Sequence, residues 1–348
     1  MKSPSLSSSP APAPLSASTT ALFTCKCMGI KCREIMDQST NNNPLTGIVL
    51  NVFDRTINVK IDDNDELLVL SLGEVASPIT VNIVLKAVVP KRQKKGNRLL
   101  LNSLSDFVFP GDQVSIMMSK TFSYRRKASI NTAKISLGKA TILIERPNYF
   151  ENKIQEFTEH SLRNFLIYSE HLLYVLMQCA KPPKQGCLLN PDMTTKGLLS
   201  EFLATICNNG NDRLRVTDIG SQEFVARLHM ALLGLCGRGP GFTPAGDDFI
   251  SGFVTMLNCI RKSFNMGPAI IPGSEFARLT TWTSFKLMEY NARGQVDIEI
   301  QELINSAAKG DALSYADKVR SLSNRGHTSG LDFSTGATFA LCMAADSI

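Results

Sequence analysis

The sequence predicts an α+β protein in which a small β-barrel or sandwich precedes a mainly helical domain. Short β-branched or apolar runs, such as residues 47–53 and 67–72, alternate with turn residues up to about residue 146. From about residue 148 the apolar residues recur at helical spacing instead. The chain has 348 residues, which suffices for two domains with sizeable cores. We therefore expect a β-rich domain over residues 44–147 and a mainly helical domain over residues 148–348.

The first 43 residues are rich in serine, proline, alanine and asparagine, and no acidic residue precedes Glu34. Such a composition does not bury enough apolar surface to fold, so we expect a disordered tail over residues 1–43. The tail lacks the apolar segment of about 7–15 residues that a secretory signal requires. Met28 and Met36 are alternative start sites, so the sequence leaves open whether this tail belongs to the mature protein.

The composition is that of a soluble protein, with 43% hydrophobic and 20% charged residues and no apolar run long enough to span a bilayer. The net charge is +6, and its densest run lies between apolar stretches without an aromatic residue: Lys91, Arg92, Lys94, Lys95 and Arg98. A solvated hairpin loop explains this run better than a nucleic-acid interface. We expect neither nucleic acid nor a membrane as a partner. Nine scattered cysteines, an odd number, favour free thiols in a reducing compartment, which predicts a cytoplasmic protein.

The expected elements follow one another along the whole chain. Strands are predicted at residues 47–53, 56–61, 67–72, 81–89, 99–101, 113–118 and 133–144. Apolar residues at helical spacing then predict helices at 151–178, 195–207, 221–236, 244–263, 275–291, 297–308, 312–323 and 335–345. No internal repeat is evident.

The most informative stretch is residues 237–252, which read GRGPGFTPAGDDFISG. Its four clustered glycines let the backbone take positive φ and let a ligand approach the main chain closely. Thr243 suits the N-cap, and Pro244 suits the first position, of the helix that follows. Free N–H groups and the helix dipole there favour an anion such as phosphate or carboxylate. The glycine spacing is not that of a P-loop or a dinucleotide site, and a purely structural loop is the alternative.

Two acidic residues, Asp247 and Asp248, follow this loop directly. They could hold a magnesium ion, orient a substrate amide or simply favour the helix start. A second loop-to-helix junction, residues 326–336, reads GHTSGLDFSTG and again combines glycines with hydroxyl groups and a carboxyl group. If the two helix N-termini converge, they form one pocket that suits a small ligand with two anionic ends. His327 is a candidate proton shuttle or phosphate donor there, and a hydrogen-bonded loop histidine is the alternative.

Both junctions resemble the hallmark motifs of the AllH-like family. In that family the first motif usually reads Gly-x-Gly-x-Gly-Leu-Thr-Pro-Ser-Gly-Asp-Asp, and the second reads Gly-His-Ser-Ser-Gly-Thr-Asp. Here Phe242 and Ala245 replace the usual Leu and Ser of the first motif, which removes one hydroxyl group from a possible ligand contact. The resemblance covers roughly residues 45–345.

The resemblance implies a component of oxamate carbamoyltransferase that acts with an FdrA-like and an AllG-like partner in allantoin and purine catabolism. That activity moves a carbamoyl group between oxalurate and phosphate and yields oxamate and carbamoyl phosphate. Both products are small anions, which glycine amides and helix N-termini suit. No cofactor is certain, magnesium is possible, and no residue is assigned as a metal ligand. The alternative is a non-catalytic interaction subunit that stabilises partner enzymes.

On this hypothesis the expected catalytic residues are Asp247, Asp248 and His327. The expected substrate-binding residues come from both motifs: Arg238, Gly239, Gly241, Thr243, Gly246, Thr328, Ser329, Gly330 and Asp332. A hydroxyl-rich segment is a further candidate for reaching the same pocket: Thr280, Thr281, Thr283 and Ser284.

Overall fold

The computed structural model describes residues 19–40, 43–62, 64–73, 75–90, 103–123, 128–145, 147–181, 184–207 and 219–347. The chain folds into two compact units, each with its own hydrophobic core. The first unit takes in the described residues of Met1–Met28, Cys32–Glu74 and Thr80–Asn148, and the second takes in Gly29–Lys31, Val75–Ile79 and Tyr149–Ile348. The basic run at residues 91–98 lies outside the described residues.

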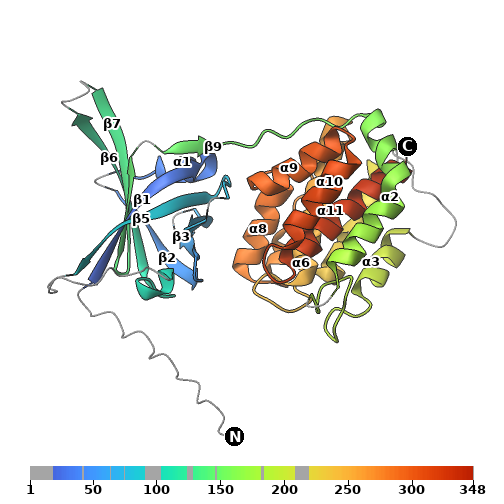
Figure 1. Cartoon of the computed structure of the whole chain (residues 1–348), viewed down its shortest axis with the longest axis horizontal. Helices are drawn as coiled ribbons and strands as arrows, with labels where there is room; N and C mark the ends of the chain where they lie inside the picture. Colours follow the sequence, from blue (N-terminus) through green and yellow to red (C-terminus); the bar gives the residue numbers. More distant parts are fainter. Residues whose placement is uncertain are drawn as a thin grey trace, which may run out of the picture. The chain divides into compact units, whose positions relative to one another are not determined.

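The first unit is a closed β-barrel (Figure 1). Within the described residues its eight strands are β1 (Thr19–Gly29), β2 (Leu45–Val52), β3 (Thr56–Ile61), β4 (Glu66–Ser71), β5 (Thr80–Pro90), β6 (Gln113–Ser123), β7 (Ala128–Leu137) and β8 (Ala140–Glu145). A short strand, β9 (Asn148–Phe150), follows β1 in the sheet order and lies outside the ring. The sheet order is β5-β4-β3-β2-β6-β7-β8-β1-β9, and an additional pairing of β1 with β5 closes the ring. The β1–β8 and β4–β5 pairs are parallel, so the barrel is mixed. The predicted fold class is confirmed, and its β part is a barrel rather than a sandwich.

Buried side chains, which form the barrel core, alternate with partly exposed ones along the strands. In β8, Ala140, Ile142 and Ile144 are buried, and the residues between them are partly exposed. Successive side chains of a strand point to opposite faces, so this alternation directs one face into the core. Helix α1 (Ile30–Met36) adds Cys32, Ile35 and Met36 to the same core.

The prediction of a disordered tail over residues 1–43 is wrong for its second half. Residues 19–36 form β1 and α1, and residues 1–18 lie outside the described residues. Strand β1 pairs with β5 and with β8, and its Ala21 and Phe23 side chains are fully buried. Composition misjudged this segment because the pairing partners that order it lie far along the chain.

The second unit is a bundle of helices (Figure 1). In chain order they are α2 (Glu159–Cys179), α3 (Leu198–Cys207), α5 (Gln222–Leu235), α6 (Ala245–Ser263), α7 (Ser274–Ala277), α8 (Trp282–Ala292), α9 (Ile298–Ala308), α10 (Ala312–Ser323) and α11 (Ser329–Asp346). The helix expected over 275–291 is interrupted, because the Thr281 side chain caps α8 by accepting a hydrogen bond from the Ser284 amide. The last helix begins at Ser329 and not at residue 335.

Helix α6 is the central helix of this unit. Almost all of its residues from Ala245 to Arg261 are buried, and it packs along α11 (Figure 1). A helix that is buried on nearly every side has to be surrounded by other helices, as α6 is. Within the described ranges, no helix combines the length and apolar character that crossing a membrane requires.

Candidate functional site

The first glycine motif forms a tight loop between α5 and α6. Gly237, Gly239 and Gly241 have φ angles of +72°, +103° and +105°, as the glycine cluster predicts. A Cβ atom on Gly246 would overlap the carbonyl oxygen of Leu235, so a larger residue does not fit there. Beyond this loop, α6 begins without a side-chain cap.

The prediction that Thr243 caps α6 is wrong. The N-cap residue is Pro244, with no side-chain hydrogen bond to the helix, and the Thr243 hydroxyl group turns to other partners. The amides of Gly246, Asp247 and Asp248 donate to carbonyl oxygens of this chain. Since these amides are already occupied, side chains rather than the α6 backbone offer the free groups of the site.

Asp247 holds the start of α6 to two other segments. One carboxylate oxygen accepts a 2.7 Å hydrogen bond from the Gly237 amide. The other accepts hydrogen bonds from the Thr280 hydroxyl group and, at 2.7 Å, from the Ser284 hydroxyl group. The residue is 1% exposed, and its charge helps to raise the pKa of the buried Cys236 thiol. Both oxygens are occupied by the chain's own donors, which is the arrangement of a carboxylate that positions the loop.

The second motif joins α10 to α11 and carries a fully buried carboxyl group. Asp332 Oδ1 accepts a 2.9 Å hydrogen bond from the Leu188 amide. Asp332 Oδ2 is buried and has no hydrogen-bond partner among the described residues. Burial raises the pKa of Asp332 well above its usual range, and the charge of Asp248 adds to the rise; the Leu188 amide and the nearby Thr328 hydroxyl group oppose it.

The two motifs are halves of an internal repeat, so the expectation of none is wrong. Residues 246–252 read GDDFISG and residues 330–336 read GLDFSTG, which share the pattern Gly-x-Asp-Phe-x-(Ser/Thr)-Gly. The preceding loops repeat as well. Arg238 donates its amide to Leu235 and accepts from the motif glycine, and Arg325 does the same with Leu322 and its own motif glycine.

The contacts between the two halves are reciprocal. A Cβ atom on Gly252 would overlap the carbonyl oxygen of Phe333, and a Cβ atom on Gly336 would overlap that of Phe249. These four residues occupy equivalent positions in the two halves. Reciprocal contacts of this kind indicate an approximate two-fold axis between the first turns of α6 and α11.

The two motifs therefore converge, as expected from their sequences. The hydroxyl groups of Thr243 and Ser329 are hydrogen-bonded at 2.9 Å, and Thr243 also donates to Asp248 Oδ2 at 3.0 Å. Burial raises the pKa of Asp248 to about 7; hydrogen bonds from Ser329 and Thr243 and the charge of Arg325 limit the rise. Asp248 and Asp332, which are equivalent in the repeat, thus both have a raised pKa, and the charge of Asp248 adds to the rise at Asp332.

Three cationic or titratable side chains lie on the loops of the motifs. Arg325 pairs with Asp297 and, at 3.7 Å, with Glu299. Arg238 and His327 are exposed, and neither side chain has a hydrogen bond or ion pair with the described residues. They are free to meet a ligand from solvent.

The remaining candidate residues are accounted for by the backbone. Gly239 packs against Ala245, and a Cβ atom on Gly330 would overlap the Leu322 carbonyl oxygen, so both glycines serve close packing. Gly241 is exposed, and Thr328 is the N-cap residue of α11 without a side-chain cap.

Sequence reasoning missed Arg325 and Leu188. Leu188 acts through its amide, which no side-chain pattern reveals, and Arg325 becomes notable only once it is aligned with Arg238 in the repeat. Of the hydroxyl-rich segment, Thr280 and Ser284 do reach the site, where they bind Asp247. Within the described part of the chain, no three His, Cys, Asp or Glu side chains lie close enough together to hold a metal ion.

Comparison with known proteins points to the same part of the chain. The family model described as oxamate carbamoyltransferase subunit AllH matches residues 235–341, a range that contains both glycine motifs and the helices between them. Neither the curated proteins nor the solved structures gave a significant match. The resemblance expected from the two motifs is thereby confirmed: residues 235–341 of this chain match the model of the AllH family.

Proposed function

We propose that this chain is a cytoplasmic subunit of oxamate carbamoyltransferase that binds the carbamoyl group where its two glycine motifs converge. The reaction joins a phosphate oxygen to the carbamoyl carbon of oxalurate and breaks the bond from that carbon to nitrogen. The proton of hydrogen phosphate ends on the departing oxamate nitrogen, so atoms and charges balance. FdrA-like and AllG-like subunits are the expected partners in allantoin and purine catabolism.

The convergence of Asp248 and Asp332 carries this proposal. Burial raises the pKa of Asp332 well above its usual range, which favours the neutral acid. Because Oδ1 accepts from the Leu188 amide, Oδ2 is the atom left to carry the proton and to donate a hydrogen bond. Asp248, with a pKa of about 7, is a proton acceptor of moderate strength.

A donor beside an acceptor matches a carbamoyl group, which has one carbonyl oxygen and one NH₂ group. We assign Asp332 to the carbonyl oxygen and Asp248 to the NH₂ group or to the proton of hydrogen phosphate. Because Oδ2 is buried, residues that cover it have to move for a ligand to reach it. We assign the carboxylate or phosphate end of the ligand to the exposed side chains of Arg238 and His327.

A calorimetric titration with oxamate, which carries an amide group beside its carboxylate, tests this assignment. The assembled complex should bind oxamate, and Asp248→Asn should weaken oxamate binding roughly tenfold to a hundredfold, as loss of one charge-assisted hydrogen bond implies. Glu223→Gln, on the exposed side of α5, is the matched control. Equal binding of oxamate by the wild-type complex and Asp248→Asn would contradict the assignment.

A non-catalytic interaction subunit is the second candidate, and an observation on α2 favours it. Ile167, Tyr174 and Met177 are 77%, 61% and 53% exposed on this helix, which is unusual for side chains of their kind. If the chain acts only by docking, Ile167→Asp should abolish co-purification with the partners. The transferase proposal instead requires that motif variants lose turnover while the complex still assembles.

A further inference from the structure

The chain between α2 and α3 lies against both glycine motifs. A Cβ atom on Gly186 would lie 3.0 Å from the Pro240 ring in the first motif. The Leu188 amide donates a 2.9 Å hydrogen bond to Asp332 in the second motif. Residues 184–195, which we call the α2–α3 segment, therefore contact the motif site from outside α6 and α11.

Hydrogen bonds within the α2–α3 segment give it a defined shape. The Gly186 amide donates to the carbonyl oxygen of Asn190, and the Asn190 amide donates to that of Cys187. The Asn190 side chain donates at 3.0 Å to the carbonyl oxygen of Ala180, next to the end of α2. Gly186 has a φ of +92°, which glycine adopts readily. A contact near the start of this segment therefore also bears on the position of the Leu188 amide.

Lys184 supplies such a contact. Its ammonium group donates a 3.2 Å hydrogen bond to the carbonyl oxygen of Gly326, the first residue of the second motif. Gly326 has a φ of +64° and directly precedes His327. Four residues further along the segment, the Leu188 amide binds Asp332. The segment thus holds the second motif at two points, its first carbonyl group and its buried carboxyl group.

The charge of Lys184 also reaches the carboxyl group of Asp332. Burial and the charge of Asp248 raise the pKa of Asp332, and the charge of Lys184 opposes this rise. The Cys187 thiol is a third titratable group near this carboxyl group, and burial followed by the charge of Asp332 raises its pKa. The ammonium group therefore lies close enough to Asp332 to affect its protonation.

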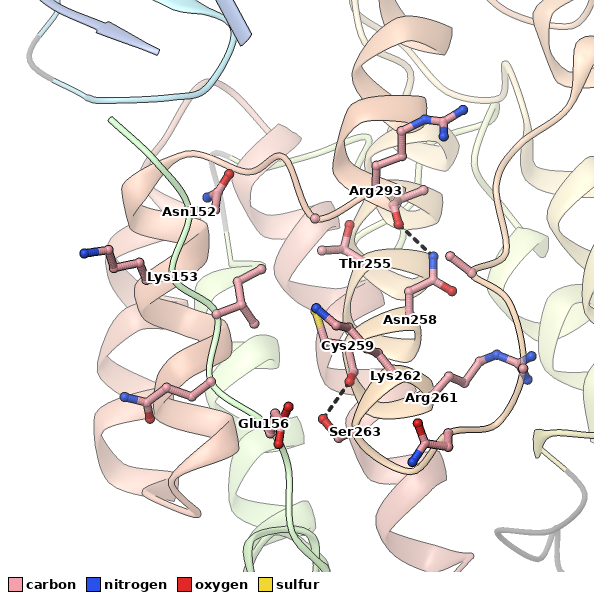
Figure 2. Close-up of a pocket in the computed structure, with 17 residues that line it drawn as sticks. Asn152, Lys153, Glu156, Thr255, Asn258, Cys259, Arg261, Lys262, Ser263 and Arg293 are labelled. Atoms are coloured by element: carbon pink, nitrogen blue, oxygen red, sulfur yellow. Dashed lines mark hydrogen bonds between the residues drawn. The ribbon is translucent and has the colours of Figure 1, made fainter. Parts of the chain in front are cut away.

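Two other features of the helical unit have different contacts. Arg325, the cation of the second motif loop, pairs with Asp297 and Glu299. A pocket beside the last turns of α6 is lined by residues of other segments (Figure 2). The contacts of Lys184 therefore belong to the motif site.

We propose that Lys184 is a positioning residue of the motif site, which holds the second motif loop to the α2–α3 segment and so keeps the Leu188 amide on Asp332. The inference rests on the proposed function for its effect on turnover. Its structural part concerns contacts within this chain and can be measured without a substrate.

Hydrogen exchange of the full chain, followed at single amides by NMR, tests the structural part. Lys184→Met keeps most of the side-chain stem but removes the ammonium group, so one of the two contacts with the second motif is lost. The Leu188 amide should then exchange roughly tenfold faster, the size expected for the loss of one hydrogen bond. Lys184→Arg keeps a cationic donor and should restore slow exchange. Lys196→Met is the matched control, because Lys196 is exposed, follows the same segment directly and carries the same charge.

Turnover of the assembled complex tests the effect on the site. In Lys184→Met, kcat should fall roughly tenfold to a hundredfold while KM changes little, because the residue places another group and does not touch the substrate. If neutral Asp332 is the active form, activity is lost as pH rises through its pKa. Removal of the cation raises that pKa further, so the alkaline limb of the pH profile should move to higher pH.

The outcomes separate this inference from the proposed function. An unchanged exchange rate of the Leu188 amide in Lys184→Met, or an equal change in Lys196→Met, would overturn the positioning role. Faster exchange with wild-type kcat would overturn it too, since the contact would then serve only folding. Faster exchange in Lys184→Met but no carbamoyl transfer by the wild-type complex would support the contact and contradict the proposed function.

Discussion

The hydroxyl groups of Thr243 and Ser329 lie 2.9 Å apart, although 86 positions separate the two residues in the sequence. This hydrogen bond joins the first turns of α6 and α11 at the approximate two-fold axis of the repeat. Near it lies Asp248, whose charge helps to raise the pKa of the buried Asp332.

The close crossing of α6 and α11 predicts that Gly252→Ala destabilises the helical unit. The added Cβ atom would overlap the Phe333 carbonyl oxygen, so the two helices would have to separate. Overpacking of this kind costs about 1–3 kcal/mol. Gly234→Ala, in α5, is the control, because a Cβ atom there meets nothing within 4 Å and should stabilise the helix by up to about 1 kcal/mol. Chemical denaturation measures both, and equal stabilities would refute the tight crossing.

We predict that Asp247 is needed for activity because it holds the first glycine loop in position. Asp247→Ala removes three hydrogen bonds and leaves the Gly237 amide without its acceptor. We expect a loss of about 2–5 kcal/mol in the free energy of unfolding, together with a loss of turnover. The measurement is urea denaturation of the isolated chain. An unchanged midpoint with abolished turnover would instead make Asp247 a catalytic residue.

Asp248 predicts a specific dependence of stability on pH. Its folded pKa, about 7, lies above the model value of 3.8. The stabilisation it gives is complete below the lower value and is lost as pH rises through the folded pKa. Relative to Asp248→Asn, the wild-type chain should therefore lose roughly 1–4 kcal/mol between about pH 4 and pH 7.

Parallel unfolding curves over this pH range test the Asp248 prediction. Asp247 and the Arg325 cation act on the pKa of Asp248, and the charge of Asp248 raises the pKa of Asp332, so the difference between the two chains reports Asp248 together with this coupling. A constant difference between the two chains from pH 4 to pH 7 would show that Asp248 is ionised like an ordinary aspartate.

Much of the fold could be predicted from the sequence, because its signals are local. Period-two runs gave the barrel strands, and helical spacing gave most of the helices. Strand β1 was not predicted, because it is stabilised by pairing with β5 and β8, which are distant in the sequence. The break before α8 was not predicted either, because it depends on a single capping hydrogen bond from the Ser284 amide to the Thr281 side chain.

The site could be predicted only in part. The glycine motifs mark it, and the residues that converge are those expected, but the partners of each carboxyl group depend on tertiary contacts. Asp247 and Asp248 are adjacent and chemically identical, yet the first is held by three donors and the second titrates near neutrality. Only the packing of α6 against α8 and α11 separates their roles.

Turnover of the assembled complex with two variants of Asp332 tests the central claim most directly. In Asp332→Asn the amide oxygen can accept from Leu188 and the NH₂ group can replace the Oδ2 proton, so the variant should retain carbamoyl phosphate formation from oxalurate and phosphate. Asp332→Ala lacks that donor and should lose roughly a hundredfold in kcat/KM, about 2.7 kcal/mol of transition-state stabilisation. Wild-type turnover in Asp332→Ala, in a complex that still assembles, would contradict the claim that this carboxyl group binds the carbamoyl oxygen.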